Sequence, residues 1–143
     1  MVINVLRHDI PELAQQFEQA GFYVPGVEDT ASGRMRSLQI THLETIGRAD
    51  LMIAGEAEFD CVKLQRRQLV VVPDRGELYF ASPEDVVLSK LKWRQQGQSE
   101  KQWRDILGIL KVQTGTLDIA YLQRWAGRLG IGSDLETALQ QSD

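Results

Sequence analysis

The pattern of apolar and polar positions in the first half of the chain is typical of short β-strands. Residues 37–41 alternate between polar and apolar side chains, which indicates a strand with one buried face. Together with the apolar segment 49–53, they predict an antiparallel hairpin across a polar turn at 42–47. Further strands are expected at residues 1–6, 22–24, 69–72 and 78–80, and the last two form a second expected hairpin.

One helix is expected between the first two strands. Its apolar stripe consists of Ile10, Leu13, Ala14 and Phe17. Asp9 is its predicted N-cap and Gly21 its stop. Residues 27–36 are polar and poorly patterned, so we expect a loop or a short helix there. Residues 56–65 are expected to form a short irregular or helical link.

Two helix-start signals in the middle of the chain predict a helical hairpin. The segment 82–85, Ser-Pro-Glu-Asp, places a hydroxyl at the N-cap, proline at the first helical position and acids in the first turn. The segment 99–102 has the form of a capping box, in which Ser99 and Gln102 satisfy each other's backbone donors. Gly97 suits a left-handed position after the first helix. The second helix carries an apolar stripe made of Trp103, Ile106, Leu107 and Leu110.

The chain is expected to stay helical to its end. Asp118 is a predicted N-cap, Gly130 a predicted C-terminal cap, and residues 133–136 a further capping box. The fold class is therefore α+β, with a small mixed β-sheet followed by a C-terminal helical bundle of three to four helices. We expect one domain over residues 1–143, in which a helical tail, 82–143, packs on a sheet-containing part, 1–81.

Composition and charge narrow the classes of function. The 143 residues carry a net charge of −4, which argues against broad electrostatic binding to nucleic acid or to an anionic membrane. The single cysteine, Cys61, cannot form an internal disulfide. No apolar run approaches the ~20 residues of a membrane span, and residues 1–8 do not resemble a signal peptide. A cytoplasmic protein is expected.

Asp50 is the most notable single candidate for a site residue. It is a carboxylate within an otherwise apolar strand, and an acid that pointed into a core would need a partner or a metal ion. The alternative, which the pattern favours, is that Asp50 lies on the solvent face of a two-sided strand. The two histidines, His8 and His42, have no second ligand at metal-binding spacing, and His42 is expected to be a solvated turn residue.

The central helices are locally basic within an acidic chain. Lys90 and Arg104 are candidates for phosphate contacts. The alternative, which is the more frequent arrangement, is an ion pair with Asp105 or Glu84 that ties the two helices together.

Three segments resemble nucleotidyltransferase-like proteins, namely the bacterial minimal nucleotidyltransferases and the relatives of AbiEii-type toxins. Residues 82–91, Ser-Pro-Glu-Asp-Val-Val-Leu-Ser-Lys-Leu, resemble the segment that follows the catalytic domain in these families. Residues 103–113 and 121–126 are similar to one mostly uncharacterised subgroup. Residues 40–51 are similar to the family's hairpin whose second strand bears its third metal-binding carboxylate. This resemblance implies that Asp50 is the matching third carboxylate.

The family's other metal ligands are missing from the sequence. Members of the family carry a Gly-Ser turn followed by a strand with two aspartates spaced Asp-x-Asp, which bind two Mg²⁺ ions and orient a nucleotide triphosphate. Residues 1–4 are similar to the tail of that strand, and no Gly-Ser turn followed by Asp-x-Asp occurs in the 143 residues. The resemblance therefore implies a truncated, catalytically incompetent nucleotidyltransferase. Mg²⁺ is expected only if the missing carboxylates are supplied.

The incomplete sheet that the resemblance implies also leads us to expect a protein partner. Loss of a leading helix and strand leaves an uncovered sheet edge and apolar surface, which association can hide. The second hypothesis is therefore a homo-oligomer or a toxin–antitoxin-like protein-interaction module. Nucleic acid is not an expected partner.

Overall fold

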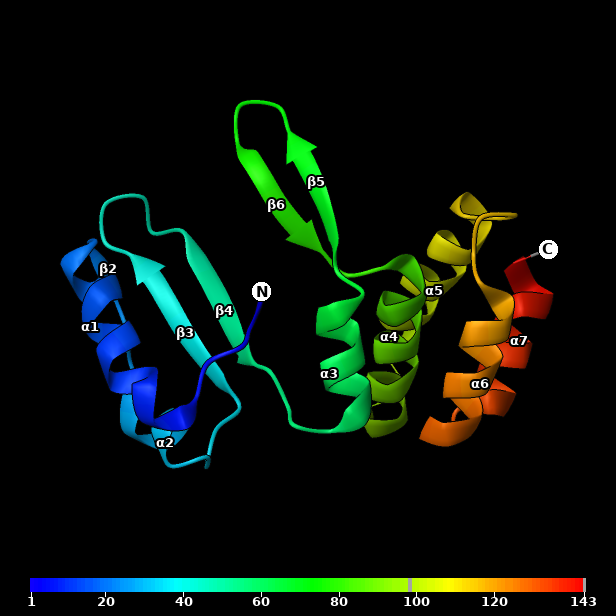
Figure 1. The fold of residues 1–143 in the computed structure, drawn as a ribbon, viewed down its shortest axis with the longest axis horizontal. Helices are drawn as coiled ribbons and strands as arrows, with labels where there is room; N and C mark the ends of the chain where they lie inside the picture. The colour runs from blue at the N-terminus through cyan, green and yellow to red at the C-terminus, as the bar shows by residue number, and fades with distance from the viewer. Residues whose placement is uncertain (98, 143) are drawn as a thin grey trace. The chain divides into compact units, whose positions relative to one another are not determined.

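The computed structural model describes residues 1–97 and 99–142. The chain divides into two compact units, Met1–Asp60 and Cys61–Asp143 (Figure 1). Helix α3 (Glu58–Gln65) contains the point of division. We describe each unit by itself, and the expectation of one domain over 1–143 stays a prediction.

The first unit contains a four-stranded mixed sheet. Its strands are β1 (Val2–Ile3), β2 (Phe22–Tyr23), β3 (Ser37–His42) and β4 (Arg48–Ile53), in the spatial order β1-β4-β3-β2. β1 runs parallel to β4, whereas β3 runs antiparallel to both β4 and β2. The predicted antiparallel hairpin is thus present, and its register pairs Gln39 with Asp50.

Helices α1 (Ile10–Gln19) and α2 (Val27–Ala31) pack against one face of this sheet (Figure 1). The core between them consists of Ile10, Ala14, Val24, Leu38, Ile40 and Leu51. The alternation of β3 explains this packing, because Leu38 and Ile40 point to the helices while Gln39 between them is exposed.

Two expectations for the start of the chain are wrong. The predicted strand 1–6 is limited to Val2–Ile3, because Leu6 leads into a 3-10 turn, η1 (Arg7–Asp9), with Asp9 N–H bonded to the Leu6 carbonyl at 3.0 Å. Asp9 does not cap α1 with its side chain. Its backbone is already right-handed helical, so it lies inside the turn rather than at a cap.

In the second unit, the end of α3 is followed by a β-hairpin that forms a sheet of its own. β5 (Gln68–Val72) and β6 (Gly76–Phe80) pair antiparallel with Val70 opposite Leu78. Asp74, in the turn between them, has a φ of 61°, and Gly76, the first residue of β6, has a φ of 80°. These strands are therefore separate from the four-stranded sheet, although we expected one sheet from the first 80 residues.

The predicted helical hairpin is confirmed as α4 (Pro83–Gly97) and α5 (Glu100–Val112). Ser82 Oγ accepts from the Asp85 backbone N–H at 3.2 Å, and Ser99 Oγ accepts from the Gln102 N–H at 3.4 Å, so both N-caps are present. The return half of the capping box is different, since the Gln102 side chain accepts from Lys90 Nζ instead. Gly97 is also not a left-handed cap, because α4 continues through it.

The chain ends in α6 (Ile119–Leu129) and α7 (Gly132–Ser142). Asp118 caps α6 as predicted, with Oδ1 accepting from the Tyr121 N–H at 2.9 Å, and Gly130 follows it at φ 71°. The predicted cap at Ser133 is wrong. Leu135 N–H already bonds to the Ile131 carbonyl, so the helix begins before Ser133.

The four helices α4 to α7, within the described residues 83–97 and 99–142, form the predicted C-terminal bundle. Its buried apolar residues include Val87, Leu88, Leu91, Ile106, Leu110, Leu122, Trp125 and Leu135. The α+β fold class, a small mixed sheet followed by a helical bundle, is therefore confirmed.

Candidate functional site

A buried polar cluster lies at the start of α4. Asp85 has 0% of its surface exposed, and both of its carboxylate oxygens have donors. The Tyr121 hydroxyl donates to Oδ1 at 2.6 Å, and the Ser82 hydroxyl donates to Oδ2 at 2.7 Å. A buried carboxylate requires such partners, because it has lost its hydration. Asp85 thus ties α6 to the start of α4.

Arg66 completes this cluster from the other end of the β5–β6 hairpin. Its Nε lies 3.4 Å from Asp85 Oδ2, and its Nη2 lies 3.5 Å from Glu84 Oε2. Its guanidinium also stacks over the Tyr121 ring, with Cζ 3.8 Å from the ring centre, and Arg124 Cζ lies 5.7 Å from the same centre. Arg66 precedes β5 and Ser82 follows β6, so both ends of the hairpin reach the same carboxylate, Asp85.

The cluster changes the acidity of two of its members. Burial by itself raises the pKa of the Glu84 carboxyl, but hydrogen bonds from the Asp118 backbone N–H and Ser82, with the charge of Arg66, outweigh burial and lower that pKa below its ordinary value of 4.5. Burial and the neighbouring Asp85 carboxylate raise the pKa of the Tyr121 hydroxyl well above its usual range. Each group therefore keeps its ordinary charge at neutral pH, so the cluster acts as a structural tie between elements.

Sequence reasoning missed the role of Asp85 and Arg66. The pattern of residues 82–85 predicts a helix start, in which the acids interact with the helix dipole, and it offers Glu84 as a candidate partner of Lys90 or Arg104. The partners that matter, Arg66 and Tyr121, lie far from Asp85 in sequence. No local spacing indicates that their side chains meet.

The structure brings two of the predicted site residues together. Lys90 on α4 donates to Asp105 Oδ2 on α5 at 2.8 Å and to Gln102 Oε1 at 2.9 Å. The Lys90 hydrogen bond and charge lower the pKa of Asp105, against a smaller opposing effect of burial. This is the ion pair between helices that the sequence offered as the alternative to phosphate binding.

Arg104 is exposed and lines an open groove between α4 and α5. The groove has a volume of about 610 Å³. Its wall is mostly apolar and includes Ala81, Pro83, Val86, Ile109 and Val112, with Lys90, Arg104 and Asp105 along one side. The expected contact of Arg104 with phosphate stays a prediction. Glu84, the other acid considered for an ion pair with these cations, is instead bonded to Arg66.

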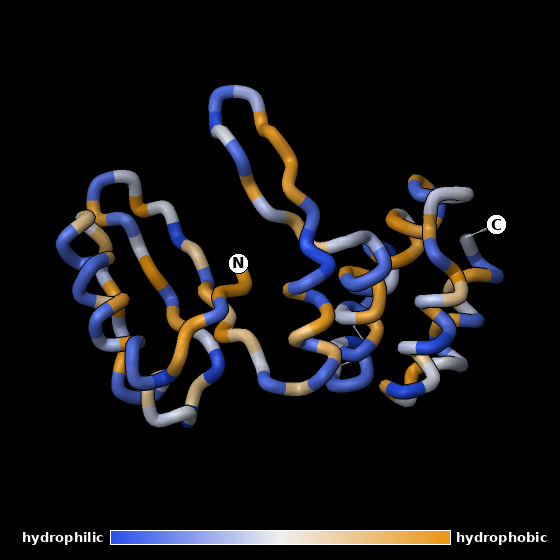
Figure 2. The backbone as a smooth tube through the Cα atoms, in the orientation of Figure 1, coloured by the Kyte–Doolittle hydropathy of each residue, from blue (hydrophilic) through white to orange (hydrophobic). Residues whose placement is uncertain are grey.

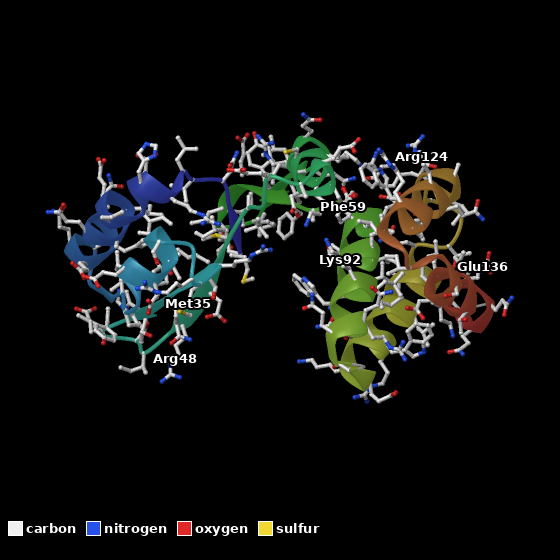
Figure 3. All side chains as sticks on the ribbon, turned by 90° about the horizontal axis from the view of Figure 1, so that it is seen from below. Met35, Arg48, Phe59, Lys92, Arg124 and Glu136 are labelled. Carbon is white, nitrogen blue, oxygen red and sulfur yellow. The ribbon has the colours of Figure 1, made fainter. Side chains whose placement is uncertain are left out.

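Asp50 lies in the first unit, on the solvent face of β4. Its side chain is exposed, and Oδ1 accepts from Gln39 Nε2 at 3.3 Å across the β3–β4 pair. Arg48, two residues earlier on the same strand, is also exposed (Figure 3). The position is therefore that of the favoured alternative from the sequence, a two-sided strand. The metal-binding role that the resemblance implies for Asp50 stays a prediction.

The contacts of the two histidines are with residues of the turns and strands around them. His42 Nδ1 lies 3.2 Å from the Thr45 backbone nitrogen, which donates to it, and its ring meets the edge of Phe22 with centroids 4.9 Å apart. His8 contacts Asp9 at 3.2 Å. Among residues 1–97 and 99–142, no group of three His, Cys, Asp or Glu side chains is placed to hold a metal ion.

The β5–β6 hairpin is the most exposed apolar element in the described part of the chain. It projects away from α4, and β5 is apolar from Leu69 to Val72, as the orange stretch of the hairpin in Figure 2 shows. Its large apolar side chains are between 41% and 71% exposed: Leu69, Val70, Val71, Leu78, Tyr79 and Phe80. In the four-stranded sheet, by contrast, Leu38, Ile40 and Leu51 are almost completely buried. An exposed apolar surface of this kind marks a binding site more often than a free surface.

Comparison with models of known protein families gave no match, and comparison with curated proteins gave none either. In the described residues, no helix is both long and apolar enough to cross a bilayer. The cytoplasmic location stays a prediction.

Proposed function

We propose that the chain is a nucleotidyltransferase-fold protein that does not transfer nucleotides by itself. The observation that carries this proposal is the position of Asp50. It is an exposed acid on the second strand of an antiparallel pair, which is where the resemblance expects the third metal-binding carboxylate. A single carboxylate is too little charge to hold two divalent cations against a triphosphate, and the sequence has no Asp-x-Asp pair to add to it.

The test is incorporation of labelled nucleotide from each of the four triphosphates, with Mg²⁺ or Mn²⁺, by the full chain. We expect no transfer above background. Transfer that is lost in Asp50→Ala but kept in Glu12→Ala, a change of another exposed acid in the same unit, would mean that the site is competent and that the chain is an enzyme. Transfer that survives Asp50→Ala would contradict the assignment of Asp50.

A second candidate function is that of a protein-interaction module, either oligomeric or part of a toxin–antitoxin-like pair. The observation that favours it is the apolar β5–β6 hairpin, because a two-stranded sheet with both faces exposed is marginally stable in water. Light scattering across a range of concentrations, together with analysis of co-purifying proteins, tests this candidate. A strict monomer without any co-purifying partner would contradict it.

A further inference from the structure

The outer edge of β5 has none of the features that keep edge strands apart. Gln68–Val72 contains no charged residue and no proline, and among the described residues only β6 pairs with it. Natural edge strands are usually blocked by charges, proline or bulges, because their free N–H and C=O groups otherwise pair with another strand. β6 differs, since it carries Glu77 in its interior.

Both faces of the hairpin are apolar next to that edge. Strand alternation and the register place Val70, Val72, Leu78 and Phe80 on one face, with Gln68 as its polar member at the end of β5. Leu69, Val71 and Tyr79 share the other face with Glu77, which lies on β6 away from the free edge. On this face the Arg67 guanidinium covers the Tyr79 ring, with Cζ 4.6 Å from its centre. A strand added at β5 would therefore continue an apolar surface on both sides.

We propose that two copies of the chain pair antiparallel along β5, centred on Val70, to form a four-stranded sheet in the order β6-β5-β5-β6. This inference rests on the second candidate function and names the partner as a second copy of the chain. Three or more strands with an apolar face are the usual minimum for a stable sheet, and this pairing supplies four.

The sequence of β5 is compatible with pairing to the β5 strand of a second copy. A two-fold axis at Val70 makes every contact reciprocal, so that Leu69 lies opposite Val71 of the second copy and Gln68 opposite its Val72. Because identical residues meet near the axis, any charge in the middle of β5 would repel itself, and the strand contains none.

The charges at the ends of β5 favour the antiparallel direction. Arg67 precedes the strand, and Asp74 lies in the turn that follows it, with Arg75 one residue further away. Antiparallel pairing brings Arg67 of each copy to the end of the second copy's strand, next to its Pro73 and Asp74. Parallel pairing would instead place Arg67 beside Arg67 of the second copy.

Val70 and Leu78 provide a matched pair of substitutions. They lie opposite each other on one face and are 41% and 42% exposed, but only Val70 lies on the proposed axis. Val70→Lys places two ammonium groups on adjacent strands, about 5 Å apart, whereas Leu78→Lys places them three strand spacings apart, about 14 Å. The second distance exceeds the Debye length of about 8 Å at physiological salt.

The experiment measures the dissociation constant of the dimer by sedimentation of the full chain and both variants. We expect a concentration-dependent dimer that Val70→Lys weakens by at least about tenfold and Leu78→Lys by less than about threefold, since like charges in contact oppose association strongly. Circular dichroism on each variant establishes that it is folded. Equal weakening by both variants would overturn the proposed edge pairing.

A cross-linking measurement keeps the proposal testable if Val70→Lys does not fold. In a Cys61→Ser background, Val70→Cys should form a disulfide-linked dimer on mild oxidation, because residues opposite each other on adjacent strands bring their Cβ atoms within reach of a disulfide. Leu78→Cys, as the control, should stay largely monomeric. The reverse result would overturn the register.

A wild-type chain that is monomeric at every concentration would also overturn self-pairing. It would leave the second candidate function standing if a different protein co-purifies in proportion to the chain and is lost on Val70→Lys. The two failures are therefore distinguishable.

Discussion

At the scale of single residues, Asp85 has the largest structural consequence in the second unit. It accepts hydrogen bonds from Tyr121 and Ser82 and lies beside Arg66, and none of its surface is exposed. Removing one member of such a cluster leaves the others buried without partners, which costs more than the hydrogen bonds themselves.

We therefore expect Asp85→Ala to lower the free energy of unfolding by about 3–5 kcal/mol, because it leaves the Tyr121 and Ser82 hydroxyls without their acceptor and removes one of the two carboxylates beside Arg66. Urea denaturation followed by circular dichroism measures the change. Glu136→Ala, at an exposed position on α7 (Figure 3), serves as the control and should change stability by less than about 0.5 kcal/mol. A similar small effect at Asp85 would mean that the cluster is not a structural tie.

Glu84 makes stability depend on pH in acid. Its pKa is lower in the folded chain than the ordinary 4.5, so the unfolded state binds protons first as the pH falls. The contribution of Glu84 is therefore fully present above about pH 4.5 and is lost as the pH drops through the lower, folded-state pKa. We expect Glu84→Gln to be less stable than wild type at pH 7, with a difference that shrinks in acid. A difference that is constant from pH 7 to pH 3 would contradict this assignment.

For single residues, the sequence predicted exposure and contacts between neighbouring helices, but it did not predict side-chain contacts between residues far apart in the chain. The alternation around Asp50 predicted an exposed acid, and the charges near Lys90 predicted its pairing with Asp105. Arg66 and Tyr121 could not be assigned to Asp85, because the contact depends on how α3, α4 and α6 pack. Local spacing contains no information about that packing.

At the scale of elements, the predicted N-cap residues can be compared with the observed starts of the helices. Ser82, Ser99 and Asp118 all cap helices as expected, because each needs only a hydrogen bond to a backbone N–H three residues later. Asp9 and Ser133 fail because neighbouring backbone bonds start the turn before them. Cap residues thus predicted that a helix begins, but not always where.

The caps differ in geometry, and we expect them to differ in strength. Asp118 accepts at 2.9 Å with a charged oxygen at the helix N-terminus, whereas Ser99 accepts at 3.4 Å with a neutral one. Asp118→Ala should cost about 1–2 kcal/mol, and Ser99→Ala about 0.5 kcal/mol or less. Thermal unfolding of the two variants gives the order, and a larger cost for Ser99→Ala would contradict the geometric argument.

At the scale of the whole molecule, the chain has two compact units with separate apolar cores. The first core lies between α1, α2 and the four-stranded sheet, and the second lies among the C-terminal helices. Composition and periodicity predicted both the sheet and the bundle. They could not predict that β5 and β6 form a separate sheet, because apolar strands look alike in sequence wherever they pair.

Core substitutions test the prediction that residues 1–143 form one domain. Leu51 and Leu122 are both completely buried, one in each unit, and replacing either with alanine should cost about 2–5 kcal/mol. If the chain unfolds as one domain, calorimetry will show that both variants lower the same transition. Two transitions, each moved by a different variant, would contradict the prediction.

The attachment of the β5–β6 hairpin has a consequence for recognition. Arg66 and Ser82, at its two ends, reach the same buried carboxylate, so the base of the hairpin is held by charge and hydrogen bonds although its strands lie in water. The anchor fixes the orientation of the hairpin before a partner binds. Binding therefore costs little conformational entropy for ordering the hairpin. Loosening the anchor should weaken recognition even though the anchor itself never touches the partner.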